Sequence, residues 1–114
     1  MLKKKESNKR YDLPVSVEYL VLAGVQTIGD GATALEIFEQ LRPIHHTLSF
    51  PSVYTALERM TWKGYVEKQL GDPESRKGGR ARNNYRITKS GQAVLKEVSA
   101  IQKRAQAMLV AATT

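Results

Sequence analysis

The stretch from Ser49 to Thr88 constrains the fold of this chain more than any other, because it joins a helical pattern to two strand-like runs. Ser49 is a candidate N-cap, and Pro51 suits the first helical turn, where its missing N–H costs nothing. Gly64 stands where a left-handed C-terminal cap is favoured. Between them, apolar residues recur at helical spacing, namely Val53, Ala56, Leu57 and Met60. The pattern predicts a helix that turns this stripe to a core and leaves its other side chains on the sides and outer face.

Two short runs follow this helix, and both show the partial alternation of β-strands. Residues 65–70 and residues 84–88 each include a tyrosine, which favours strand structure. Residues 71–82 between them are polar and rich in turn formers, so we expect the two runs to pair as a hairpin with a long loop. The loop is basic, and its cations are Arg76, Lys77, Arg80 and Arg82.

Two further helices are predicted upstream. Pro14 suits the first turn of one helix, whose apolar residues recur at helical spacing through positions 17–28. Thr33 and Glu36 fit a capping box, in which the hydroxyl and the carboxylate each satisfy a free backbone N–H. They predict a second helix that starts at Thr33 and ends at Pro43. The residues that this helix is expected to bury are Leu35, Ile37, Phe38 and Leu41.

A final helix is predicted after Thr88, which can cap it. Its apolar positions step by four and three residues in turn, which is a heptad seam, and the seam consists of Val94, Val98, Ile101, Ala105, Met108 and Ala112. Such a helix can pack on its own domain or pair with a second copy of the chain. At ~1.5 Å per residue it would be about 35 Å long, longer than a small domain can cover. Because an exposed seam of that length is costly, we predict that residues 89–114 form a dimerisation helix.

The order of the elements, three helices followed by a hairpin, predicts a winged helix-turn-helix in residues 13–88, a mainly α fold with a small β-hairpin. Residues 1–12 are polar and basic, and we expect a flexible tail that is either solvated or in contact with a polyanion. The chain of 114 residues carries 18 Lys and Arg against 11 Asp and Glu, a formal net charge of +7. A surplus of this size favours a polyanionic partner, with nucleic acid first and an anionic membrane surface second.

In a winged helix-turn-helix, the N-terminal half of the third helix enters the major groove of DNA. The side chains that the pattern places there to meet phosphates or base edges are Ser52, Tyr54, Thr55 and Arg59. The Tyr54 ring can instead pack sideways onto the hairpin. Glu58 has no assigned role, since it can pair with Arg59 or Lys63 or accept from a cytosine amino group. The hairpin loop is expected to bind phosphates through Arg76, Lys77, Arg80 and Arg82 and to supply non-specific affinity.

The residues that other functions would need are missing or misplaced. The chain has no cysteine, and the adjacent His45 and His46 lack the i, i+4 spacing of a helical metal pair. There is no Gly-x-Ser-x-Gly elbow and no phosphate loop, so we predict no enzymatic activity, no metal and no cofactor. No clean secretory signal and no run of ~20 apolar residues is present, which predicts a cytoplasmic protein without a membrane span. The remaining alternative to DNA binding is a winged helix that binds another protein.

Two groups of residues form a recognisable signature. The first consists of Ser52, Val53, Tyr54, Ala56, Leu57, Met60, Lys63, Gly64, Tyr65 and Val66, and the second of Gly78, Gly79, Arg80, Arg82, Tyr85, Arg86, Ile87, Thr88 and Gly91. They resemble the core signature of the PadR family of transcriptional regulators, and the resemblance covers about residues 17–95. It implies a homodimer that binds a palindromic operator in double-stranded DNA, usually as a repressor, with the first and last helices forming the dimer. It also implies that a small aromatic or drug-like effector binds near the dimer interface, as in many relatives.

The sequence departs from the family pattern in three places. Thr33, Ala34 and Leu35 replace a His-Gly-Tyr-like segment at the start of the second helix. Trp62 stands where a charged residue is usual, and it is interpreted either as a surface aromatic or as a ring that stacks on a ligand or a dimer partner. The final helix is short beside relatives with a full C-terminal domain, which argues against a large effector cavity.

Overall fold

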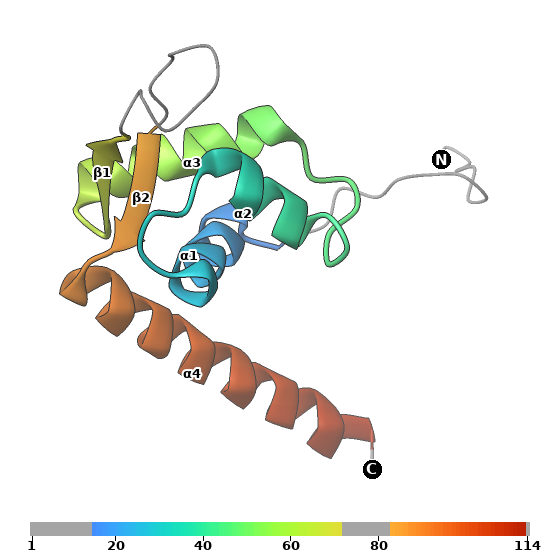
Figure 1. The fold of residues 1–114 in the computed structure, drawn as a ribbon. Helices are drawn as coiled ribbons and strands as arrows, with labels where there is room; N and C mark the ends of the chain where they lie inside the picture. The colour runs from blue at the N-terminus through green and yellow to red at the C-terminus, as the bar shows by residue number, and fades with distance from the viewer. Residues whose placement is uncertain (1–14, 72–82, 114) are drawn as a thin grey trace.

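The computed structural model describes residues 15–71 and 83–113, which form a mainly helical fold with one small antiparallel hairpin (Figure 1). The elements in chain order are α1 (Val17–Ile28), α2 (Ala34–Leu41), α3 (Phe50–Lys63), β1 (Val66–Leu70), β2 (Asn83–Ile87) and α4 (Lys89–Thr113). This order and arrangement is the predicted winged helix with a long C-terminal helix. The predicted tail, residues 1–12, lies outside the described residues, and so do residues 72–82 of the hairpin loop.

Side-chain caps fix the start of each helix. Ser16 accepts from the Tyr19 N–H at 3.1 Å, so α1 begins at Val17, later than Pro14 suggested. The capping box of α2 is formed as predicted, because the Thr33 hydroxyl accepts from the Glu36 N–H at 3.2 Å and the Glu36 carboxylate accepts from the Thr33 N–H at 3.0 Å. Ser49 caps α3 through its hydroxyl, which accepts from the Ser52 N–H at 3.3 Å.

The first three helices enclose the core. Each contributes residues with almost no exposed surface, among them Val21, Val25, Ile37 and Leu57. The predicted burial of Leu35 is wrong, since its side chain is 45% exposed. The helix α2 is only eight residues long and turns Ile37 and Leu41 inward, which leaves Leu35 in its first turn on the outside.

The hairpin pairs β1 with β2 in antiparallel register, with Val66 opposite Ile87 and Lys68 opposite Tyr85. A third segment joins it, because Ala32 and Tyr85 exchange two backbone hydrogen bonds of 2.7 and 3.2 Å. The strand β2 therefore lies between β1 and the loop before α2, and the Tyr85 side chain is only 1% exposed. The sequence patterns did not predict this bridge.

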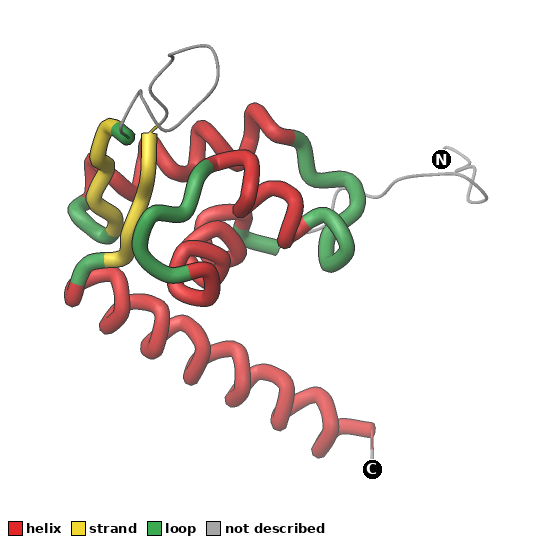
Figure 2. The backbone as a smooth tube through the Cα atoms, viewed as in Figure 1, coloured by secondary structure: helices red, strands yellow, loops and turns green. Residues whose placement is uncertain are grey.

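The hairpin is tied to the helices on both sides. Gly64 ends α3 in a left-handed conformation with φ 85°, as predicted. The Thr88 hydroxyl donates to the Gly64 carbonyl at 2.7 Å and accepts from the Gly91 N–H at 3.0 Å, so one side chain joins the end of α3 to the start of α4. From there α4 runs past α1, and its C-terminal part extends away from the other helices (Figure 2).

Candidate nucleic-acid interface

The faces of α3 divide as the sequence predicted. Val53, Ala56, Leu57 and Met60 are at most 4% exposed, which turns the opposite side of the helix to solvent. Of the predicted reading residues, three are exposed and one is half-buried; the exposed ones are Tyr54, Thr55 and Arg59, and the half-buried one is Ser52. These four do not form one cluster, because they lie on two flanks of the helix.

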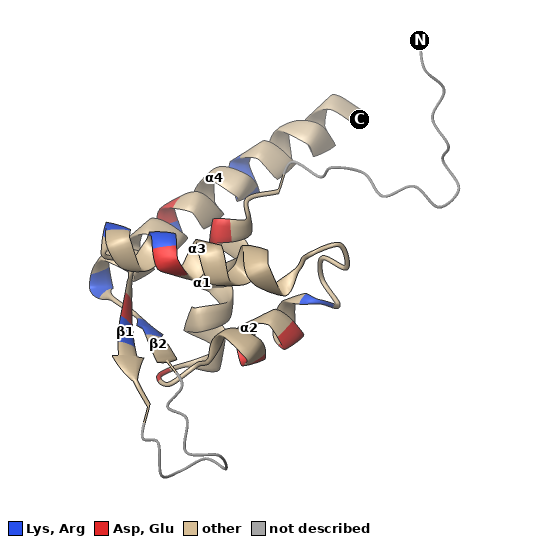
Figure 3. Cartoon of the chain, turned by 90° about the horizontal axis from the view of Figure 1, so that it is seen from above, with Lys and Arg blue, Asp and Glu red and all other residues tan. Residues whose placement is uncertain are grey.

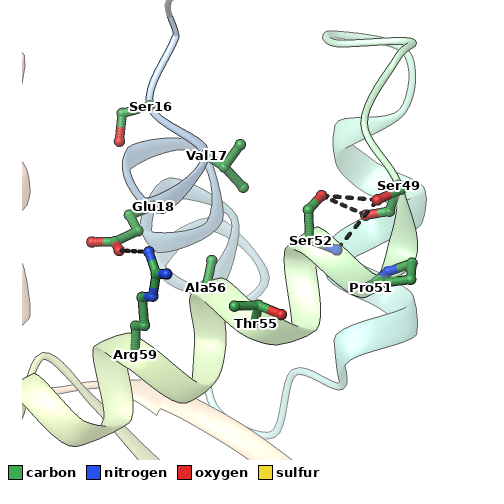
Figure 4. A pocket seen from close by; sticks show the side chains of 9 residues that line it. All are labelled: Ser16, Val17, Glu18, Ser49, Pro51, Ser52, Thr55, Ala56 and Arg59. Carbon is green, nitrogen blue, oxygen red and sulfur yellow. Dashed lines mark hydrogen bonds and ion pairs between the residues drawn. The ribbon is translucent and has the colours of Figure 1, made fainter.

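One flank of α3 faces the start of α1. Ser52, Thr55 and Arg59 line a shallow groove of about 610 Å³ between the two helices, together with Ser16 and Glu18 of the α1 end (Figure 4). The Ser52 hydroxyl donates to the Ser49 carbonyl at 2.9 Å, so it is held against its own helix start. The groove presents hydroxyl groups and one guanidinium on the exposed side of α3.

Glu18 is the charged partner of this flank. Its carboxylate lies 3.6 Å from a guanidinium nitrogen of Arg59 and 2.9 Å from the Lys63 Nζ. The Arg59 side chain remains 66% exposed, so the pair is a surface contact that a phosphate can compete for. Glu18 lies more than 40 positions upstream of both cations, and no spacing in the sequence pointed to it.

Glu58 lies on the opposite flank of α3 and contacts the hairpin. Its carboxylate accepts from Lys68 at 3.1 Å and from the Tyr85 hydroxyl at 3.4 Å. Of the alternatives left open for Glu58, the pairing with Arg59 or Lys63 is not formed, since both of those side chains contact Glu18 of α1. Burial, and secondarily the Glu58 charge, raise the pKa of Tyr85 above its ordinary value.

Tyr54 lies on this second flank beside a small apolar cleft. The cleft has a volume of about 220 Å³ and is formed where the starts of α2 and α3 meet β2. Its wall includes Leu35, Phe50, Tyr54 and Tyr85. Both interpretations of Tyr54 are compatible with this position, because its ring borders the hairpin while 42% of the residue stays exposed.

The positive charge of the chain is unevenly distributed. The described residues carry nine Lys and Arg against seven Asp and Glu, and charges of both signs are scattered over them (Figure 3). Most of the net charge of +7 therefore comes from residues outside the described ranges. The four predicted phosphate-binding cations of the loop, Arg76, Lys77, Arg80 and Arg82, are among these residues.

The predicted dimerisation residues of α4 fall into two groups. Val94 and Val98 are half-buried beside an apolar groove between α1 and α4, and Val94 also packs against the core. Ile101 is 50% exposed and Met108 is 72% exposed, and Ala105 between them is exposed as well. The first part of the helix thus packs on its own domain, and the second part presents an apolar face to solvent.

The sequence of residues 26–97 matches the model of the transcriptional regulator PadR-like family. The chain belongs to the PadR-like family. Its fold is similar to a PadR family transcription regulator from Clostridium difficile R20291, with a TM-score of 0.73, 19% identity, and coverage of 86% of this chain and 98% of that chain. A PadR-like transcriptional regulator from Bacillus cereus ATCC 14579 gives a TM-score of 0.67 at 22% identity, covering 82% of this chain and 86% of that chain.

The winged helix of this PadR-like protein also resembles that of a more distant regulator. The Multiple Antibiotic Resistance Repressor MarR matches with a TM-score of 0.63 and 17% identity, over 87% of this chain and 63% of that chain. No curated protein matches the sequence closely. Since the family and the structural neighbours are transcriptional regulators, the PadR-like chain is a DNA-binding regulator and not an enzyme, as predicted. None of the helices in the described ranges is long and apolar enough to cross a membrane.

Proposed function

We propose that this PadR-like protein is a sequence-specific repressor that binds a palindromic DNA operator as a homodimer. The observation that carries the proposal is the division of α3, whose one side is buried in the core while its other sides carry exposed hydrogen-bonding groups. Ser52, Tyr54, Thr55 and Arg59 contact phosphates and base edges in the major groove. Residues 13–88 are the DNA-binding domain, and the protein acts in the cytoplasm.

The hairpin loop supplies the attraction to DNA. Arg76, Lys77, Arg80 and Arg82 neutralise backbone phosphates, and each phosphate contact contributes about −0.9 to the slope of log affinity against log salt. The described body is nearly balanced in charge, which supports this division of labour between the loop and α3.

The dimer forms through residues 89–114. Its contact is the seam of Val94, Val98, Ile101, Ala105 and Met108, supported by the exposure of the last three in the single chain. A dimer with a twofold axis presents two α3 helices, so the operator is a palindrome with half-sites about one helical turn apart. The groove of about 350 Å³ between α1 and α4 has an apolar lining that includes Tyr19, Leu22 and Met60, and it suits a small aromatic effector.

Selection of bound sequences from a random duplex pool tests the proposal. We expect a palindromic motif, and binding of any duplex at low salt that weakens steeply as salt rises. Charge reversal of Arg80 and Arg82 to Glu is expected to reduce non-specific affinity and flatten the salt slope. The matched control reverses Lys96 and Lys103, which are exposed on the side of α4 away from the seam. Absence of duplex binding at low salt would instead support a winged helix that binds another protein.

A further inference from the structure

The apolar cleft beside Tyr54 is lined in part by side chains that the core leaves exposed. Three of its residues expose large apolar side chains, with Leu35 at 45%, Phe50 at 39% and Tyr54 at 42%. They come from the starts of α2 and α3, and β2 forms the remaining wall through Asn83 and Tyr85. Single exposed apolar residues are ordinary, but three that converge on one concave site indicate a binding surface.

The position of the cleft connects it to the surface that meets DNA. Phe50 and Tyr54 lie in the N-terminal half of α3, the half that enters the major groove in helix-turn-helix proteins. The cleft therefore lies on the flank of α3 that carries Tyr54, one of the predicted reading residues. Figure 1 shows the loop before α2 running beside β2, where Ala32 and Tyr85 form their bridge.

The described residues that line the cleft offer no cation to a phosphate group. The Glu36 carboxylate caps the first turn of α2 through the Thr33 N–H, which offsets the partial positive charge of that helix end. Glu58 lies behind Tyr85 and is occupied by Lys68. None of the described lining residues is charged and most of the lining is apolar, so the cleft suits an uncharged apolar group.

The major groove offers one apolar group of this kind, the C5-methyl group of thymine. We propose that the cleft of Leu35, Phe50 and Tyr54 receives thymine methyl groups of the operator and makes Leu35 and Phe50 specificity-determining residues. This inference rests on the proposed DNA-binding function and names part of the sequence that the protein reads. The replacement of a His-Gly-Tyr-like segment by Thr33, Ala34 and Leu35 then changes base preference and not only packing.

Uracil scanning of the selected operator tests the inference, because replacing thymine by deoxyuracil removes only the methyl group. Burial of one methyl group contributes about 0.8 kcal/mol, which corresponds to about a fourfold change in affinity. We expect one or two thymines in each half-site at which deoxyuracil weakens binding of the wild type by about that factor. Leu35→Ala is expected to weaken binding to the thymine operator and to lose this sensitivity, whereas Leu35→Met keeps it.

Ile44→Ala is the matched control. Ile44 is 67% exposed and follows the C-terminal end of α2. Its substitution therefore removes an apolar side chain similar to that of Leu35 without changing the cleft. Thermal unfolding checks that all three variants remain folded. An operator without a methyl-sensitive thymine, or a Leu35→Ala variant as sensitive as the wild type, overturns the inference while leaving operator binding intact. Failure to recover any operator overturns the proposed function as well.

Discussion

Glu18 of α1 holds two cations of α3, and this contact has a direct consequence for DNA binding. The Glu18 side chain is 29% exposed and its single negative charge is shared between Arg59 and Lys63 in the free protein, so phosphates must compete with it. Exposed ion pairs contribute little to folding, which means that Glu18 affects binding more than stability. Its position makes it a restraint on Arg59, which keeps the guanidinium on the α1 side of the helix.

Glu18→Gln is expected to raise affinity for non-specific duplex DNA severalfold at low salt. The salt slope should steepen by about 0.9 for each cation that gains a phosphate, and the free energy of unfolding should change by less than about 1 kcal/mol. Fluorescence anisotropy with duplexes at several salt concentrations measures both quantities. Glu97→Gln on α4 makes the same charge change away from α3. An equal gain in DNA affinity for this variant would show that the effect comes from the net charge and not from the contact of Glu18 with α3.

Tyr85 links the stability of the hairpin to pH. Its folded-state pKa lies above the ordinary value of 10.0, so the unfolded chain releases the proton first as pH rises. The stability from this group is therefore fully present below about pH 10 and is lost above it, by up to ~1.4 kcal/mol per pH unit. Tyr85→Phe should lose about 1 kcal/mol at neutral pH with the hydrogen bond to Glu58, and should show a shallower decline between pH 10 and 11.

Urea denaturation at pH 8, 10 and 11 measures this difference. Tyr19→Phe on α1 removes a hydroxyl from another half-buried tyrosine and should decline with pH as the wild type does. If the free energy of unfolding falls with pH at the same rate in the wild type and in Tyr85→Phe, a different group limits stability at alkaline pH.

At the scale of elements, local signals predicted the helices and their caps well. The capping box of Thr33, the cap at Ser49 and the left-handed Gly64 are each set by residues within a few positions, so the sequence reveals them directly. Contacts between elements were missed, because no periodicity encodes them. The bridge from Ala32 to Tyr85, the ion pairs of Glu18 and the exposure of Leu35 all depend on how helices are oriented in space.

Gly91 shows how closely α4 approaches the hairpin. It is buried, and a Cβ atom there would meet the Tyr65 carbonyl oxygen and come within 2.8 Å of the Ile87 Cγ1. Gly91→Ala gains about 1 kcal/mol of helix propensity but should lose about 1–3 kcal/mol through overpacking, so we expect net destabilisation. Urea denaturation measures it, and Ser90→Ala, at the exposed neighbouring position, should stay within about 0.5 kcal/mol of the wild type. A more stable Gly91→Ala variant would mean that α4 docks less closely.

At the scale of the whole molecule, the distal half of α4 is the proposed dimer contact, and a dimer brings two α3 helices to one operator. Residues 101–113 are all exposed in the single chain and include Ile101, Met108, Leu109 and Val110, an apolar surface too extensive for ordinary solvent contact. Linking two DNA-binding domains makes the second binding event intramolecular, which can raise operator affinity by 10²–10⁴-fold. Dimerisation and operator affinity should therefore be lost together.

Met108→Glu places a carboxylate in the proposed seam, where burial without a partner costs several kcal/mol. Sedimentation equilibrium should show that the dissociation constant of the dimer rises by about a hundredfold or more. The helical content and the fold of the winged helix should be retained. Operator affinity should fall towards that of a single half-site, while non-specific affinity per chain changes little. Gln106→Glu adds the same charge about two residues away on the opposite side of α4, and should remain dimeric. If the Met108→Glu protein stays dimeric, the dimer interface does not include this seam. If the wild type is monomeric and still binds the operator with full affinity, dimerisation is not needed for operator binding.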